Sequence, residues 1–274
     1  MKRSNTLPPH RVTTAMPASA ARPPGRAAPR RLAALALLGL AACEAGPLDA
    51  IELAPTTLTQ GMVAHWTFDE GEGTVVRDSS GNMRDGALTG GTWVQDGRFG
   101  KAMHLGEGEF MAVDSFPNAT ASWSVSAWVR LTSDEPAPEV LATVVSTEDT
   151  GGWEINIDYA QSPPGMHFGF WKGPENGDYQ FLICFCMEPR RWTHAAAVVD
   201  GEALTMSLYL DGRLDQAAPI DVTIAPGSNT LYVGRWVGAG RFLFADVDDI
   251  VIYSRALAPA EVAELSQRSP PDPR

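Results

Sequence analysis

Short segments in which apolar and polar residues alternate cover most of the chain from residue 61 onward. In the segment SWSVSAWVRL (122–131), one side of an extended strand carries Trp123, Val125, Val129 and Leu131. The same alternation recurs in segments 153–158, 166–171, 193–200, 204–212 and 230–236. A period of two residues is that of a strand with one face buried, so roughly a dozen segments of this kind predict an all-β chain.

Two further signals define how the strands are connected and how the chain ends. The pair Asp211-Gly212 lies between two apolar runs and predicts a tight β-hairpin. Near the end, PAEVAELSQ predicts one short helix, with Pro259 in its first turn and Val262 and Leu265 on a buried face. Many short strands without alternating helices favour a two-sheet antiparallel sandwich.

The first 43 residues differ in kind from the rest. They contain seven Lys or Arg and no Asp or Glu, and an apolar run from Leu32 to Ala42 ends at Cys43. A basic region followed by about ten apolar residues indicates a secretory signal rather than a membrane-spanning helix, which needs about 20. Residues 1–42 are therefore predicted to be a signal peptide, and residues 43–60 a tether.

The segment Leu40-Ala41-Ala42-Cys43 resembles the lipobox of bacterial lipoproteins. That resemblance implies cleavage before Cys43 and lipidation of its thiol, and Glu44 in the next position favours the outer membrane. The alternative is an ordinary signal peptide with a chance cysteine. We expect an exported protein that contacts the membrane only through its lipid anchor.

Charge narrows the range of partners. Removal of residues 1–42 takes away seven of the 21 basic residues and none of the 33 acidic ones, which leaves a net charge of −19. A surface this acidic repels nucleic acid and anionic lipid, but suits divalent cations. The pair Cys184-Phe-Cys186 could form a disulfide in an oxidising compartment or remain two buried thiols.

Five segments, in order, resemble the laminin G-like, concanavalin A-like jelly-roll domains of exported bacterial proteins. These segments are 63–88, 98–113, 122–131, 190–214 and 244–265. The resemblance implies a domain over residues 61–266, with a disordered tail at 267–274. It also implies two curved antiparallel sheets, often a structural calcium, and use in adhesion or glycan binding. Fold alone does not settle function, because the same sandwich also serves hydrolases and structural modules.

Acidic residues near both ends of this domain are the candidate calcium ligands. They are Asp69, Asp78 and Asn82 near its start, and Asp248 and Asp249 near its end. Calcium binds six to eight oxygens, and the first and last strands of a jelly roll are commonly neighbours. Alternation places Asp248 on the face of Ile250 and Ile252, at the edge of the core. Its alternatives to calcium are backbone donors or an arginine, because a buried carboxylate needs a partner.

Aromatic residues among Gly, Asp and Asn are the candidate glycan contacts, since apolar sugar faces stack on exposed rings while amides and carboxylates bind hydroxyls. We predict a set made of Trp153, Trp171, Tyr179, Trp236 and Asn156.

An alternative is hydrolysis. Glu154, Asn156 and Asp158 would share one face of a strand, as three acids do in laminarinase-type glucanases. Here the middle residue is an amide, and the two acids are about 13 Å apart by strand spacing. A retaining hydrolase needs about 5–5.5 Å. We therefore expect a non-enzymatic binding domain whose partner is a polysaccharide, or a structural module that binds an envelope protein.

Overall fold

The computed structural model describes residues 58–119, 121–132, 141–147, 151–160, 162–172, 179–221, 224–238 and 240–270. Its contacts divide the chain into two units, 1–52 and 53–274, and all described residues belong to the second. The predicted signal peptide, Cys43, most of the tether and residues 271–274 lie outside the described residues. Within the described ranges, no helix has the length and hydropathy needed to cross a membrane.

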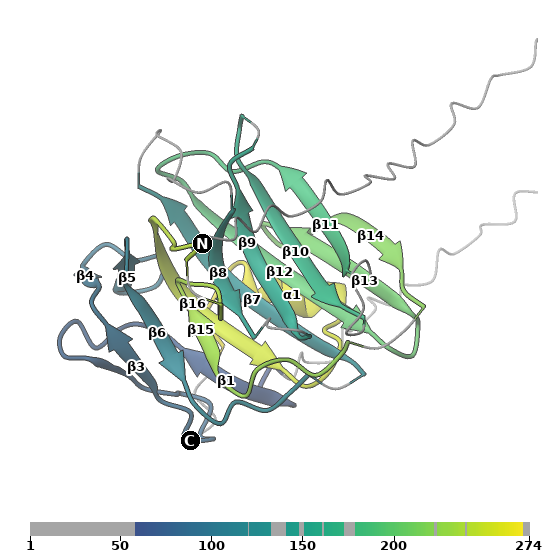
Figure 1. Cartoon of the computed structure of the whole chain (residues 1–274), viewed down its shortest axis with the longest axis horizontal. Helices are drawn as coiled ribbons and strands as arrows, with labels where there is room; N and C mark the ends of the chain where they lie inside the picture. Colours follow the sequence, from purple (N-terminus) through teal and green to yellow (C-terminus); the bar gives the residue numbers. More distant parts are fainter. Residues whose placement is uncertain are drawn as a thin grey trace, which may run out of the picture. The chain divides into compact units, whose positions relative to one another are not determined.

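The described residues form two antiparallel sheets (Figure 1). The first sheet has the order β14-β13-β12-β7-β16-β5-β4, and β1 also pairs with β16. Its strands are β1 (Met62–Trp66), β4 (Thr92–Val94), β5 (Ala102–Leu105), β7 (Trp123–Leu131), β12 (Trp192–Asp200), β13 (Thr205–Leu210), β14 (Arg213–Pro219) and β16 (Ala245–Tyr253).

The second sheet has the order β11-β10-β9-β8-β15-β6-β3-β2. Its strands are β2 (Val75–Val76), β3 (Gly86–Thr89), β6 (Phe110–Val113), β8 (Leu141–Ser146), β9 (Trp153–Asp158), β10 (Gly165–Trp171), β11 (Tyr179–Phe185) and β15 (Leu231–Val233). Together the two sheets confirm the predicted all-β sandwich.

One hydrophobic core fills the space between the sheets, and alternation decides which side chains enter it. In β7, Trp123, Val125 and Val129 are buried in this core, as the sequence pattern predicts. The facing strand β9 contributes Ile155 and Ile157. In each strand, the side chains between the core residues lie on the outer face of their sheet.

At one edge of the sandwich the two sheets meet. Figure 1 shows β11 of the second sheet beside β14 of the first. Gln180 Nε2 donates to the Pro219 carbonyl at 2.7 Å, and Gln216 Nε2 donates to the Ile183 carbonyl at 2.5 Å. These bonds satisfy backbone groups that an open edge would leave unpaired.

The Asp211-Gly212 turn confirms the predicted hairpin between β13 and β14. Both residues have positive φ, 47° and 77°. This conformation matches the twist of the flanking strands and favours glycine at the second position.

The helix α1 (Pro259–Leu265) covers part of the outer face of the first sheet. Val262 and Leu265 are buried, as predicted, in a second hydrophobic cluster that includes Leu58, Tyr209 and Tyr253. Both the start of the domain and its end therefore pack on this sheet.

Strand β16 departs from the expected alternation. A β-bulge interrupts its pairing with β7 between Asp248 and Val251, and Asp249 has a φ of 47°. Val247 and Ile250 both face the core, so the alternation shifts by one residue between them. Asp248 pairs with Trp128 and lies on the outer face, which corrects the prediction that it shares a face with Ile250.

The cysteine near the end of β11 and the one just after it form a disulfide. Cys184 and Cys186 have Cα atoms 5.5 Å apart, within the range that a disulfide requires. Of the two alternatives that the sequence leaves open, the structure has the bonded one.

Candidate ligand-binding face

The predicted calcium residues of the first loop instead organise the backbone of that loop. Asp78 accepts hydrogen bonds from the N–H groups of His65, Ser80 and Arg84, at 3.0, 2.9 and 3.0 Å. Burial acts to raise the pKa of Asp78, but hydrogen bonds from the Ser80 side chain and from these three N–H groups together lower it. Asn82 donates its amide N–H to the carbonyl of Met62 at 3.0 Å, so its Nδ2 is directed at the strand.

The carboxylates of β16 accept hydrogen bonds from backbone or side-chain donors. Asp248 is fully buried, and its Oδ2 accepts the N–H groups of Arg98 and Phe99 at 2.7 and 2.9 Å. Burial raises the pKa of Asp248 to about 8, and the nearby carboxylates of Asp249 and Asp69 contribute to this rise. At neutral pH the carboxyl is therefore largely protonated.

Asp249 and Asp69 are bonded at two other places. Asp249 Oδ1 lies 2.8 Å from His65 Nε2 and accepts the Ser269 hydroxyl at 2.5 Å. Asp69 accepts the Lys101 N–H at 2.8 Å. Ser269, which the sequence places in a disordered tail, is thus in contact with the domain.

The five predicted ligands do not fit one calcium site. Calcium needs several oxygens directed at one point, whereas the oxygens of these residues are directed at separate backbone and side-chain donors. Across the described part of the chain, no group of three or more His, Cys, Asp or Glu side chains could hold a metal ion. We derive no role that depends on calcium.

Trp153 is a core residue, which corrects its assignment to the glycan contacts. Its side chain is 2% exposed and stacks on Trp123 with ring centroids 4.5 Å apart. The same alternation that directs Ile155 and Ile157 inward directs Trp153 inward, and this signal was available in the sequence.

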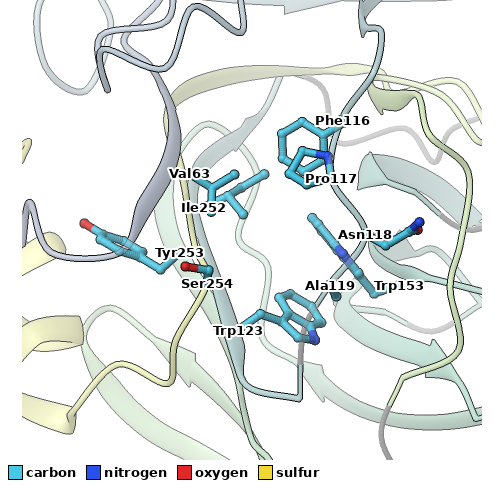
Figure 2. Close-up of a pocket in the computed structure, with 10 residues that line it drawn as sticks. All are labelled: Val63, Phe116, Pro117, Asn118, Ala119, Trp123, Trp153, Ile252, Tyr253 and Ser254. Carbon is cyan, nitrogen blue, oxygen red and sulfur yellow. The ribbon is translucent and has the colours of Figure 1, made fainter.

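A small apolar pocket lies beside this tryptophan pair. It has a volume of about 90 Å³ and is lined by residues of both sheets (Figure 2). Val63 and Ile252 come from β1 and β16, and Phe116 comes from the segment before β7. Ligand pockets usually measure about 300–1,000 Å³, so this pocket is too small for a saccharide.

The other candidate residues gather on the outer face of the second sheet. Glu154 and Asn156 alternate with core residues of β9 and lie on the outer face of the sheet, but Asn156 is 0% exposed, which corrects its assignment to the glycan contacts. Glu154 is 3% exposed; its Oε1 accepts the Tyr179 hydroxyl at 2.7 Å, and its Oε2 lies 3.1 Å from Arg241 Nη1. Asn156 Nδ2 lies 3.3 Å from His167 Nδ1 on the neighbouring strand.

Aromatic rings from β10 and β11 adjoin this polar group. Tyr179 contacts Trp171 with centroids 5.0 Å apart and stacks with Phe181 at 6.1 Å. His167 lies beneath, with its ring 5.1 Å from that of Phe181. Trp171 and Tyr179 are half-buried, so each presents part of its ring to solvent.

Trp236 reaches the same face through its contact with Arg241. The Arg241 guanidinium lies 4.8 Å from the centre of the Trp236 ring while it pairs with Glu154. Nearby in the chain, Arg235 lies 4.7 Å from the rings of both Phe110 and Tyr232. The segment after β15 therefore adds arginines and a tryptophan to the face of the sheet.

The residues of the hydrolase alternative share this face but differ in surroundings. Glu154 is buried and paired with Arg241, whereas Asp158 accepts the Ala160 N–H at 2.8 Å. Asn156 separates them along the strand. The arrangement holds Glu154 in place as a hydrogen-bond acceptor.

Sequence reasoning missed two aromatic residues of β11. Phe181 and Phe185 are 47% and 52% exposed. Because Leu182 and Cys184 are buried in the core, alternation along YQFLICF could have placed both phenylalanines on the outer face.

Comparison with known proteins agrees with the fold. The family model described as the concanavalin A-like lectin/glucanases superfamily matches residues 105–263. A search of curated proteins found no match.

Several solved structures are similar. Domain 4 of AbnA, a GH43 extracellular arabinanase from Geobacillus stearothermophilus, in complex with arabinotriose, has a TM-score of 0.60 and 22% identity, over 75% of this chain and 98% of that chain. The binding domain of Paraclostridial Mosquitocidal Protein 1 has a TM-score of 0.61 and 19% identity, over 76% and 52%. The botulinum neurotoxin serotype D binding domain has a TM-score of 0.60 and 16% identity, over 77% and 53%. The chain thus spans about half the length of the two toxin domains.

Proposed function

Because the chain belongs to the concanavalin A-like lectin/glucanases superfamily, we propose that it is a non-enzymatic glycan-binding domain, exported and held at the cell envelope by a lipid anchor. Membership of this superfamily indicates the fold, whereas the function has to be inferred from the residues of the site. The face of the second sheet around β9, β10 and β11 is the proposed binding surface.

One observation carries this proposal. Trp171, Tyr179 and Trp236, three of the four aromatic residues that the sequence nominates for glycan contact, lie on the same face as the hydrogen-bonding groups of Glu154 and Arg241. The combination of partly exposed rings with fixed polar groups is what saccharide recognition requires. Rings contact the C–H faces of the sugar, and charged or amide groups bond its hydroxyls.

The polar groups of this face are preorganised. Tyr179 and Arg241 both bond Glu154, and each is also held by an aromatic neighbour, Trp171 and Trp236 respectively. Side chains that are already ordered lose little conformational entropy when a ligand binds.

The structural neighbours support the same class of function. The arabinanase domain is described in complex with arabinotriose, and the toxin domains are described as binding domains. At 16–22% identity they share the fold, and the proposal for this chain rests on its own residues.

The location of the protein is proposed from the sequence. The basic and apolar segments before Cys43 support export, and Leu40-Ala41-Ala42-Cys43 supports lipidation. Mass spectrometry of the N-terminal peptide tests this. A Cys43→Ala variant is expected to leave the membrane fraction, and a wild-type protein without lipid on Cys43 would contradict the anchor.

Retention on immobilised polysaccharides tests the binding function. Trp171→Ala should weaken retention, whereas Trp192→Ala, a half-buried tryptophan of the first sheet, should leave it unchanged. Equal retention of the two variants would contradict the proposed surface. Release of soluble sugars from the polysaccharide would contradict the non-enzymatic role.

A further inference from the structure

The outward side chains of β11 form a row that extends beyond the site described above. Alternation places Phe181, Ile183 and Phe185 on the outer face of this strand, opposite the buried Leu182 and Cys184. Phe181 is 47% exposed, Phe185 is 52% exposed, and Ile183 between them is half-buried. The row therefore presents two rings of one strand to solvent, and Tyr179 continues it into the polar group around Glu154.

The ring of Phe181 is held from below, and the backbone of Phe185 is constrained. Phe181 stacks with Tyr179 at 6.1 Å and contacts His167 at 5.1 Å, so one side of its ring is covered and the other remains accessible. Phe185 lies between the two cysteines of the disulfide, which fixes the backbone on both sides of it. An aromatic side chain held like that of Phe181 can bind with little loss of rotamer freedom.

The surroundings of the row carry little net charge. Burial lowers the pKa of His167, so the imidazole is neutral at neutral pH. Glu154 pairs with Arg241, and Lys172 pairs with Asp221 at 2.9 Å. On a chain with a formal net charge of −12, Glu154 and Lys172 are each paired with an opposite charge, and the further carboxylate near His167, that of Asp158, accepts the Ala160 N–H, so an uncharged ligand desolvates few isolated charges here.

We propose that β11 binds an uncharged polysaccharide that lies along the strand, with one sugar ring on Phe181 and another on Phe185. This inference rests on the glycan-binding function proposed above and specifies its ligand as an extended neutral chain. Four residues of a strand span about 13 Å, which is longer than one pyranose ring, so the two phenylalanines contact different units of the chain.

The polar neighbours of the row favour this occupant over a protein. Next to Phe181, the outer-face positions of β9 and β10 are Glu154, Asn156 and His167, which are only 3%, 0% and 6% exposed and do not extend the apolar row. The core of a stable protein interface is depleted in charged residues and well packed. A saccharide chain, in contrast, needs only the exposed rings for its C–H faces, and its hydroxyls can remain in solvent.

Isothermal titration of the mature chain with neutral oligosaccharides of two to six units, prepared from arabinan, laminarin and xylan, tests the inference. For whichever of the three polysaccharides is bound, the affinity for its oligosaccharides should increase with their chain length. Phe181→Ala and Phe185→Ala should each lower the affinity for the longest oligosaccharide about two- to tenfold. They should have less effect on the disaccharide, which cannot reach both rings.

Val75→Ala is the matched control, because Val75 is 48% exposed on β2, at the opposite edge of the second sheet from β11. Thermal melts of all variants show whether each is folded. Polygalacturonate, an anionic chain, serves as the charged probe.

The possible outcomes distinguish this inference from the glycan-binding function on which it rests. If Trp171→Ala abolishes binding while both phenylalanine variants bind like the wild type, the row is not the site, although the glycan function stands. If the wild type binds polygalacturonate alone, the uncharged ligand is wrong. If the wild type dimerises through the two phenylalanines, this inference fails, whereas the glycan function is still decided by Trp171→Ala. If the wild type binds none of these saccharides, both proposals fail.

Discussion

Tyr179 on β11 reaches across β10 to donate a 2.7 Å hydrogen bond to Glu154 on β9. The intervening position on β10 is Gly169, which pairs with both Glu154 and Phe181. A Cβ atom at Gly169 would lie 2.0 Å from the Tyr179 hydroxyl oxygen. The absence of a side chain there is what allows the tyrosine to cross the strand and bond the carboxylate.

Gly169→Ala should therefore displace Tyr179 and disrupt the proposed binding face. We expect weaker glycan binding and a loss of about 1–3 kcal/mol in the free energy of unfolding, as for other overpacked sites. Calorimetric titration and urea unfolding measure the two effects. Gly106→Ala is the control, because its Cβ would approach no atom closer than 3.3 Å. An unchanged affinity in Gly169→Ala would show that the position of Tyr179 does not matter.

Tyr179→Phe removes the hydroxyl and keeps the ring. Glu154 is 3% exposed and would retain Arg241 as a partner, so we expect a loss of about 1–3 kcal/mol in stability from the buried oxygen that loses its donor. Stacking with a sugar should persist. Urea unfolding compares this variant with Tyr232→Phe, a half-buried tyrosine on the same face. Equal stability of the two variants would contradict the structural role of the Tyr179–Glu154 bond.

Trp153 and Trp171 should respond in opposite ways to substitution. Trp153→Ala removes a ring that is stacked in the core, with an expected loss of about 3–5 kcal/mol in stability. Trp171→Ala should change stability little and weaken glycan binding. Thermal melts and titrations measure both. To separate folding from binding, Trp153→Phe is titrated as well, and it should bind like the wild type.

Alternation in the sequence predicts most of this fold, because the core of a sandwich selects one side of each strand. It fails where the backbone leaves the regular repeat. At Asp248 and Asp249 a bulge shifts the phase, and a single sequence carries no clear signal for that shift. Trp153 could have been placed correctly from Ile155 and Ile157.

The site was less predictable than the fold because it depends on neighbours in space. Glu154 and Arg241 are 87 positions apart, and only the pairing of β8 with β15 and the segment that follows brings them together. Within the predicted calcium set, Asp69, Asp78 and Asp248 accept backbone N–H groups, and Asp249 contacts the side chains of His65 and Ser269; alternation describes none of these contacts.

Asp248 should make stability depend on pH. Its pKa in the folded protein is raised to about 8 from an ordinary value of 3.8, so the folded state binds this proton more strongly than the unfolded state. The resulting stabilisation is full below pH 4 and is lost as pH rises through 8. Asp248→Asn keeps an acceptor for the N–H groups of Arg98 and Phe99 but cannot titrate. Relative to this variant, the wild type should lose stability between pH 4 and 9 in urea unfolding; parallel curves would contradict the raised pKa.

The most direct test of the account is the affinity of the mature chain for neutral polysaccharides, measured with the wild type and with Trp171→Ala. The account predicts saturable binding of at least one of arabinan, laminarin or xylan, no release of soluble sugar, and a marked loss of affinity in the variant while Trp192→Ala binds normally. Saturable binding that Trp171→Ala leaves intact would contradict the proposed face, and the absence of binding to all three would contradict the proposed function.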